Sequence, residues 1–140
     1  MTRRRGTRGA AALAVIAVAL SGAGPAGAAR DPVRLTVSFT RGSDSRHVAH
    51  LRCTGARSTA DGFLRTAGAA RVCAHVRRIA ALLAAPPPKR RACTQIYGGP
   101  ERALVTGTIG TRRIRRGFHR TNGCGIADWR RAMPLLPRPG

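Results

Sequence analysis

The sequence contains few acidic residues, which limits the chemistry that the chain can carry out. Five carboxylates are present among its 140 residues: Asp31, Asp44, Asp61, Glu101 and Asp128. No two of them have the spacing of an acid/base pair. Two of the four histidines, His47 and His50, lie three residues apart in a strand-like segment, which places them on opposite faces. No glycine-rich phosphate loop follows a strand and opens a helix. We therefore expect a protein that is not an enzyme and that requires no metal or cofactor.

The apolar run near the N-terminus is too short to span a bilayer, because residues 10–20 number only 11. Arginines precede this run and Ala26-Gly27-Ala28 follows it, which is the pattern of a secretory signal peptide and its cleavage site. We assign residues 1–28 to a signal peptide and residues 29–140 to one small secreted domain, which is not inserted in a membrane after cleavage. An N-terminal membrane anchor is the alternative interpretation.

No two cysteines have the C-x₂-C spacing of a zinc site. The four cysteines lie far apart in the exported part of the chain: Cys53, Cys73, Cys93 and Cys124. An even number in a short exported chain predicts two disulfides, and three pairings are possible. Sequential pairing would close loops of about 20 and 31 residues, each worth roughly 3–4 kcal/mol. Two such bridges would be comparable to the whole net stability of a small domain.

Lysine is almost absent, yet the chain is strongly basic. Of its 26 basic residues, Lys89 is the only lysine, and 22 basic residues remain after position 28 against five acidic ones. Such a charge is typical of proteins that bind nucleic acid, anionic lipid or acidic polymers. The arginines are scattered, however, with almost no aromatic residues between them, so we favour a compositional origin and expect no specific nucleic-acid binding. A secreted cationic protein that binds polyanions, cell wall or membrane surfaces is the alternative function.

Alternation of apolar and polar residues predicts four strands, arranged as two antiparallel pairs. The predicted strands cover residues 33–40, 46–53, 102–109 and 112–120, with a loop over residues 54–62. A helix is predicted from Thr66 to Ala85, because its apolar residues form one stripe: Val72, Val76, Ile79 and Leu83.

Thr66 or Asp61 could cap the N-terminus of this helix, and Pro86 ends it. A second, short helix is expected from Ile126 to Met133, followed by Leu135 and Leu136 as an edge strand or part of the core. The expected fold class is α+β: a small antiparallel sheet of about four to five strands, with one main helix and a short helix packed on it and two disulfides.

Residues 90–100, between the two predicted halves, cannot form a regular helix or a good central strand. They include Gly98, Gly99 and Pro100, and they follow the three prolines at 86–88, which form an extended connector. A segment that is extended, exposed and attached at Cys93 is suited to presentation to a partner. We expect the remainder of the chain to form a platform that holds this segment in place.

The spacing of the cysteines and of their neighbours resembles the subtilisin inhibitor family of Streptomyces. The similarity runs from about Val33 to Cys124 and rests on a cysteine in the first sheet, a helical cysteine and two motifs. The first motif is Cys93-Thr94-Gln95-Ile96-Tyr97 with Pro100, and the second is Asn122-Gly123-Cys124.

The resemblance implies a homodimeric inhibitor of secreted subtilisin-like serine proteases. It places the reactive bond between Gln95 and Ile96, two residues after the third cysteine. It implies the sequential disulfides and a supporting role for Asn122. The neighbouring residues that would contact the protease are Ala92, Thr94 and Tyr97.

Overall fold

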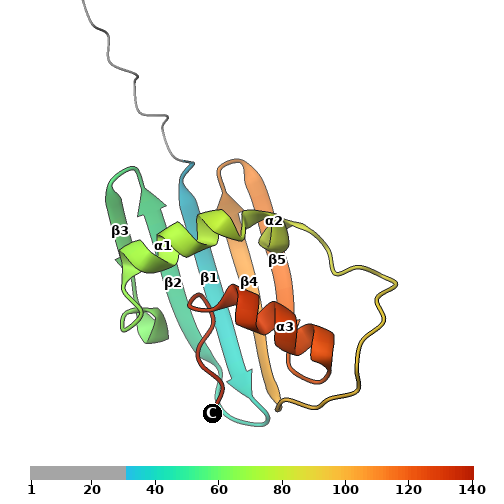
Figure 1. Ribbon diagram of the computed structural model, residues 1–140. Coiled ribbons are helices and arrows are strands. Elements are labelled where there is room, and N and C mark those ends of the chain that lie inside the picture. Colours follow the sequence, from blue (N-terminus) through green and yellow to red (C-terminus); the bar gives the residue numbers. More distant parts are fainter. Residues whose placement is uncertain (1–30) are drawn as a thin grey trace, which may run out of the picture.

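The computed structural model describes residues 31–140, and the predicted signal peptide at residues 1–28 lies outside the described residues. Five strands form one antiparallel sheet in the order β3-β2-β1-β4-β5 (Figure 1). The strands are β1 (Val33–Arg41), β2 (His47–Thr54), β3 (Arg57–Ala60), β4 (Glu101–Ile109) and β5 (Arg112–His119). The helical segments are η1 (Gly62–Leu64), α1 (Ala69–Arg78), α2 (Ala80–Ala84) and α3 (Gly123–Ala132).

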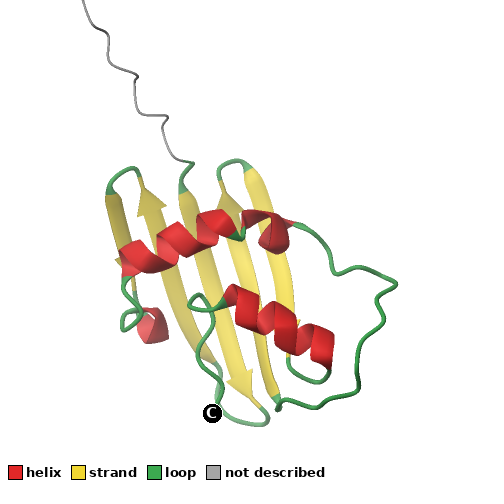
Figure 2. Cartoon of the chain, in the orientation of Figure 1, coloured by secondary structure: helices red, strands yellow, loops and turns green. Residues whose placement is uncertain are grey.

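Helices α1, α2 and α3 all lie on one face of the sheet (Figure 2). The expected α+β class is therefore confirmed, with two disulfides and two helices of ten residues. In the part of the chain that the structure describes, no helix has the length and apolar character needed to cross a membrane.

The core lies between this sheet face and the helices. Alternate residues of β1, including Val33 and Val37, are completely buried, as the apolar periodicity predicts. Trp129 of α3 is 1% exposed and its ring meets that of Phe39 edge to face, with 6.1 Å between centroids. Leu135 also enters the core after α3, so the alternative of a final edge strand is wrong.

The long helix expected from Thr66 to Ala85 is two helices, α1 and α2. Ile79 separates them, with φ −100° and ψ 14°. Thr66 does not cap the helix, because its hydroxyl donates to the carbonyl of Phe63. The apolar stripe itself is correct: Val72, Val76 and Leu83 are buried, while Ile79 is only partly buried.

Two further boundaries differ from the prediction. The expected loop over residues 54–62 contains the edge strand β3, whose sequence Arg-Ser-Thr-Ala has no strong apolar signal. Helix α3 starts at Gly123 instead of Ile126, because the Asn122 side chain accepts a hydrogen bond from the Gly125 N–H, 2.9 Å away. This N-cap outweighs the poor helix propensity of the two glycines in the first turn.

The sequential disulfide pairing is confirmed. The Cys53–Cys73 bridge joins β2 to α1 in the core between the sheet and the helix, and both cysteines are buried. The Cys93–Cys124 bridge joins α3 to the segment between α2 and β4. One disulfide therefore fixes the core, and the other fixes the segment singled out as functional.

Candidate functional site: the loop between α2 and β4

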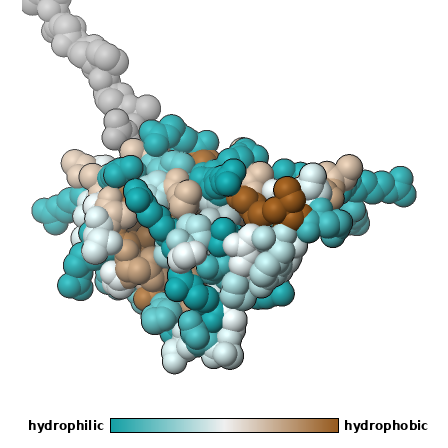
Figure 3. All heavy atoms as spheres, turned by 60° about the horizontal axis from the view of Figure 1, so that its bottom comes forward, coloured by the Kyte–Doolittle hydropathy of each residue, from teal (hydrophilic) through white to brown (hydrophobic). Residues whose placement is uncertain are grey.

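Residues 85–100, here called the presented loop, connect α2 to β4 without a helix or strand and extend beyond the edge of the sheet (Figure 1). The residues singled out from the sequence are all exposed in it: Ala92, Thr94, Gln95, Ile96 and Tyr97. Ile96 is 63% and Tyr97 65% exposed, which is unusual for large apolar side chains. Figure 3, which views the molecule from the lower side of Figure 1, shows compact hydrophobic patches among mostly hydrophilic residues. Exposed apolar side chains on a loop are typical of a contact surface.

Two backbone hydrogen bonds hold the presented loop on either side of Gln95. The Gly123 N–H donates to the carbonyl of Thr94 over 2.9 Å, and the Gly98 N–H donates to the carbonyl of Arg120 over 2.8 Å. The Cys93–Cys124 bridge adds a covalent attachment beside the first bond. Only residues 95–97 lie between the two attachment points, so the predicted reactive bond lies in a free span of three residues.

Glycine leaves room for neighbouring side chains at two positions where the loop meets the start of α3, Gly98 and Gly123. A Cβ on Gly123 would clash with the Thr94 hydroxyl, and a Cβ on Gly98 would lie 2.7 Å from the side chain of Ile126. A larger residue at either position would require the side chain of Thr94 or Ile126 to move. The Gly98-Gly99 pair thus allows the loop to return closely against the start of α3 before β4 begins.

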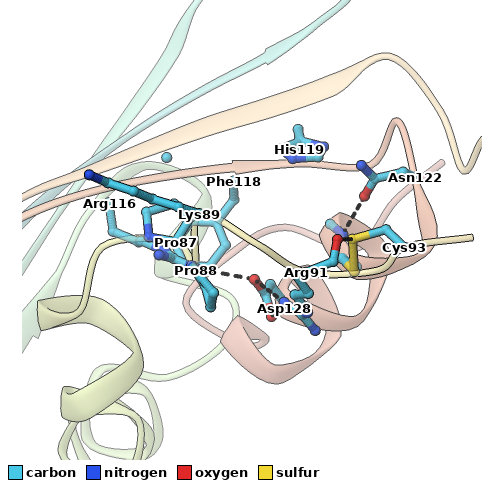
Figure 4. A pocket seen from close by; sticks show the side chains of 13 residues that line it. Pro87, Pro88, Lys89, Arg91, Cys93, Arg116, Phe118, His119, Asn122 and Asp128 are labelled. Carbon is cyan, nitrogen blue, oxygen red and sulfur yellow. Dashed lines mark hydrogen bonds and ion pairs between the residues drawn. A yellow bond between two sulfur atoms is a disulfide. The ribbon is translucent and has the colours of Figure 1, made fainter.

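A buried ion-pair network holds the N-terminal arm of the presented loop (Figure 4). Arg91 donates to both oxygens of Asp128, each 3.1 Å away, and Arg116 donates to Asp128 over 3.1 Å. Arg116 also donates to the carbonyl of Ala85 over 3.0 Å, at the beginning of the loop. Since the Arg116 side chain is only 4% exposed, the charge of Asp128 is needed to balance it.

A second carboxylate holds the C-terminal arm. Glu101, the first residue of β4, is 3% exposed and accepts a hydrogen bond from Arg120 over 2.9 Å. Arg41 approaches its other oxygen at 3.5 Å. Burial tends to raise the pKa of Glu101, but a hydrogen bond from its own backbone and the two arginines outweigh this effect, so the pKa lies below its ordinary value. The carboxylate therefore remains charged, and this contact persists, until the pH falls through that lowered pKa.

The Asn122 side chain does not hydrogen-bond the presented loop in the described structure. It caps α3 and so fixes the first turn of that helix, from which Gly123 and Cys124 contact the loop. Asn122 therefore supports the loop through the helix end. The sequence singled out Asn122 as a residue near the loop, but its side chain contacts α3 and makes no direct hydrogen bond to the loop.

A cavity of about 210 Å³ lies beneath the N-terminal arm of the presented loop. Its walls include Pro88, Phe118 and His119, with the Arg91–Asp128 pair at one side (Figure 4). Gln95 and Ile96 do not line it, so it is a space behind the loop and separate from the exposed contact residues.

Two histidines away from the presented loop are engaged in local contacts. His50 pairs with Asp61, and its backbone N–H donates to the same carboxylate; these two hydrogen bonds lower the pKa of Asp61. His75 contacts the carbonyl of Arg131 at 2.9 Å. Over residues 31–140, no three of the histidine, cysteine and acidic side chains are close enough to hold a metal ion.

Comparison with known proteins gives no relative: no family model, curated protein or solved structure matches this chain.

Proposed function

We propose that this protein is a secreted inhibitor of subtilisin-like serine proteases, with the bond between Gln95 and Ile96 at the reactive site. The observation that carries this proposal is the short exposed span between two fixed backbone positions. Thr94 and Gly98 are hydrogen-bonded to the platform, whereas the side chains between them face solvent. The disulfides and the resemblance to the subtilisin inhibitor family support the same function.

The physics of inhibition fits this arrangement. A protease binds an extended chain and attacks one carbonyl carbon, and a flexible peptide loses conformational entropy when it is bound. The presented loop is already held in place, so its binding requires little further ordering. After cleavage, the Cys93–Cys124 bridge would keep the new chain end beside its former neighbour, and religation would compete with hydrolysis.

The side chains of the presented loop are best suited to a protease with a broad specificity pocket. Ala92 and Thr94 are small, and Gln95 is neutral and unbranched. Gln95 offers no cation to the carboxylate in a trypsin-like pocket and little apolar area to a chymotrypsin-like one. A subtilisin-like protease is therefore the proposed target, with Tyr97 contacting it beyond the reactive bond.

Substitution of Gln95 should change which protease is inhibited. Gln95→Lys should strengthen trypsin inhibition roughly tenfold or more, because close charge pairs across interfaces couple by about 1.5 kcal/mol or more. Gln95→Leu should improve subtilisin binding by about 1–2 kcal/mol through additional apolar burial. The measurements are inhibition constants of the exported protein and its variants against both proteases.

Thr59→Lys is the matched control, because it adds the same charge at an exposed position of β3. It should leave both constants unchanged, and the stability of the Gln95 variants should stay within about 0.5 kcal/mol of the native value. Unchanged constants in the Gln95 variants, or cleavage at another bond after long incubation, would show that the reactive site is wrongly placed.

Asn122→Ala should weaken inhibition of every protease and speed cleavage between Gln95 and Ile96. Loss of the cap should destabilise the protein by about 0.5–2 kcal/mol and loosen the first turn of α3, which holds the loop. Asn122→Ser retains a capping oxygen and should behave nearly as the native protein does. Mass spectrometry after incubation with subtilisin measures the cleavage rate, and equal rates for the two variants would argue against the support assigned to Asn122.

The homodimer implied by the resemblance remains a prediction. In a symmetric pair formed through the sheet face opposite the helices, arginines of the two copies would approach one another.

A further inference from the structure

One face of the sheet is covered by helices, and the other carries no packed element among residues 31–140. We call this second face the open face. It presents Arg34 and Thr36 of β1, His50 and Arg52 of β2, Thr106 and Thr108 of β4, and Arg113 and Arg115 of β5. The four arginines are exposed, whereas Leu35, Leu51 and Ile114, which adjoin them in their strands, are buried in the core.

The register of the sheet places these side chains in two rows that run across four strands. The first row is Arg52, Arg34, Thr108 and Arg113, and the second is His50, Thr36, Thr106 and Arg115. Since neighbouring strands are about 4.8 Å apart, each row is about 14 Å long. The rows therefore form a continuous cationic strip lined with hydroxyl groups.

The arginines of the open face include a pair of like charges on neighbouring strands, which is unfavourable for a sheet. Arg34 lies directly opposite Arg52, and like charges in that position destabilise a strand pair. None of the four arginines takes part in an ion pair with another described residue. Asp61 borders the second row, but it is paired with His50 and not with any of these arginines, so the repulsion between Arg34 and Arg52 has no acidic partner among residues 31–140 to offset it. A ligand that carries negative charge would relieve it.

The open face is also hollowed between the arginines. A depression of about 320 Å³ is lined in part by Arg34, Arg52 and Thr108. A second, of about 400 Å³, is lined in part by Thr108, Arg113 and Arg115. Both include Gly107 and Thr108, so the two depressions adjoin and together cross the sheet from β2 to β5.

We propose that the open face binds a linear phosphate polymer, a function beyond protease inhibition. Guanidinium groups match phosphate oxygens with two parallel hydrogen bonds, and threonine hydroxyls add further donors. A polymer is favoured over a single phosphate because the charges are spread along the strip. Nucleic acid is disfavoured, because the strip has no phenylalanine, tyrosine or tryptophan side chain on which bases could stack.

The test measures the affinity of the exported protein for long-chain inorganic polyphosphate at several salt concentrations. The double variants Arg34→Ala/Arg52→Ala and Arg113→Ala/Arg115→Ala should each bind at least tenfold more weakly. Each should also lower the slope of log affinity against log salt by about one to two, because two phosphate contacts are lost. Inhibition of subtilisin should be unchanged in both.

Arg78→Ala/Arg131→Ala is the matched control, since it removes two exposed arginines from α1 and α3 on the other side of the sheet. It should reduce the affinity less than twofold. An equal loss in this control would overturn the proposal in favour of diffuse charge attraction. Tighter binding of a single-stranded oligonucleotide with the same number of phosphates would overturn it in favour of nucleic acid.

A second copy of the chain could cover the open face in place of polyphosphate. Sedimentation of the same variants tests this alternative, because it measures self-association. If removing the open-face arginines changes self-association while the affinity for polyphosphate stays constant, the face is a dimer interface and the proposal fails. Absence of polyphosphate binding by the native protein at low salt would also overturn it. Tenfold losses confined to the open-face variants, with unchanged sedimentation, are the expected result.

Discussion

Replacement of Asp128 by asparagine is expected to lower the free energy of unfolding by about 3–5 kcal/mol. The side chain of Asp128 balances Arg116, which is 4% exposed, and it holds Arg91 on the presented loop. Asparagine keeps the shape of the side chain but removes its charge, so the guanidinium of Arg116 would remain buried without a counter-ion. Urea unfolding of the two proteins measures the difference.

Two variants show whether this loss arises from the buried network. Asp44→Asn makes the same chemical change in an exposed turn, and should change stability by less than about 0.5 kcal/mol. Arg91→Ala removes the partially exposed member of the network, so it should cost at most about 1 kcal/mol, yet it should weaken inhibition by freeing the loop. Equal losses for Asp128→Asn and Asp44→Asn would mean that the network contributes no net stability.

Removal of the Cys93–Cys124 bridge by serine at both positions should reduce stability by about 4 kcal/mol, as expected for a 31-residue loop. If the protein is the protease inhibitor that we propose, the change should also convert it into a substrate, because the chain end formed at Gln95 could leave the active site of the protease. The measurements are the unfolding free energy at low temperature and the rate of proteolysis by subtilisin.

Removal of the Cys53–Cys73 bridge is the matched comparison. That bridge closes 20 residues and should contribute about 3 kcal/mol, but it does not touch the presented loop. The two double variants should thus lose similar stability and differ strongly in cleavage rate under conditions where both are folded. Similar cleavage rates would mean that global unfolding, not loop attachment, controls proteolysis.

The strands and the main apolar stripe could be predicted because burial imposes a period on the sequence. Val33 to Phe39 alternate, and Val72, Val76 and Leu83 recur at helical spacing. Strand β3 could not be found in this way, because it lies at the sheet edge and none of its residues is fully buried. The break at Ile79 could not be predicted either, since no proline or glycine marks it and residues that favour helix, alanine and leucine, follow it.

The attachment of the presented loop was predicted only in part. The disulfide was expected, but the two carboxylate networks depend on pairs far apart in the sequence, such as Arg91 with Asp128 and Arg120 with Glu101. One local signal was present: Arg116 lies between Ile114 and Phe118 at strand spacing, so it had to point inward and required a buried partner. With five acidic residues in the chain, the choice of partner was small.

The pairing of β1 with β4 has a consequence for the protein after cleavage between Gln95 and Ile96. The cut would divide the domain into two fragments, one with β1, β2, β3 and α1 and the other with β4, β5 and α3. The central seam of the sheet, nine register pairs from Val33 opposite Ile109 to Arg41 opposite Glu101, would then run between the fragments. The cleaved molecule would consist of two complementing fragments that share one sheet and one core. We therefore expect it to keep its fold while the bond between Gln95 and Ile96 is cleaved and re-formed.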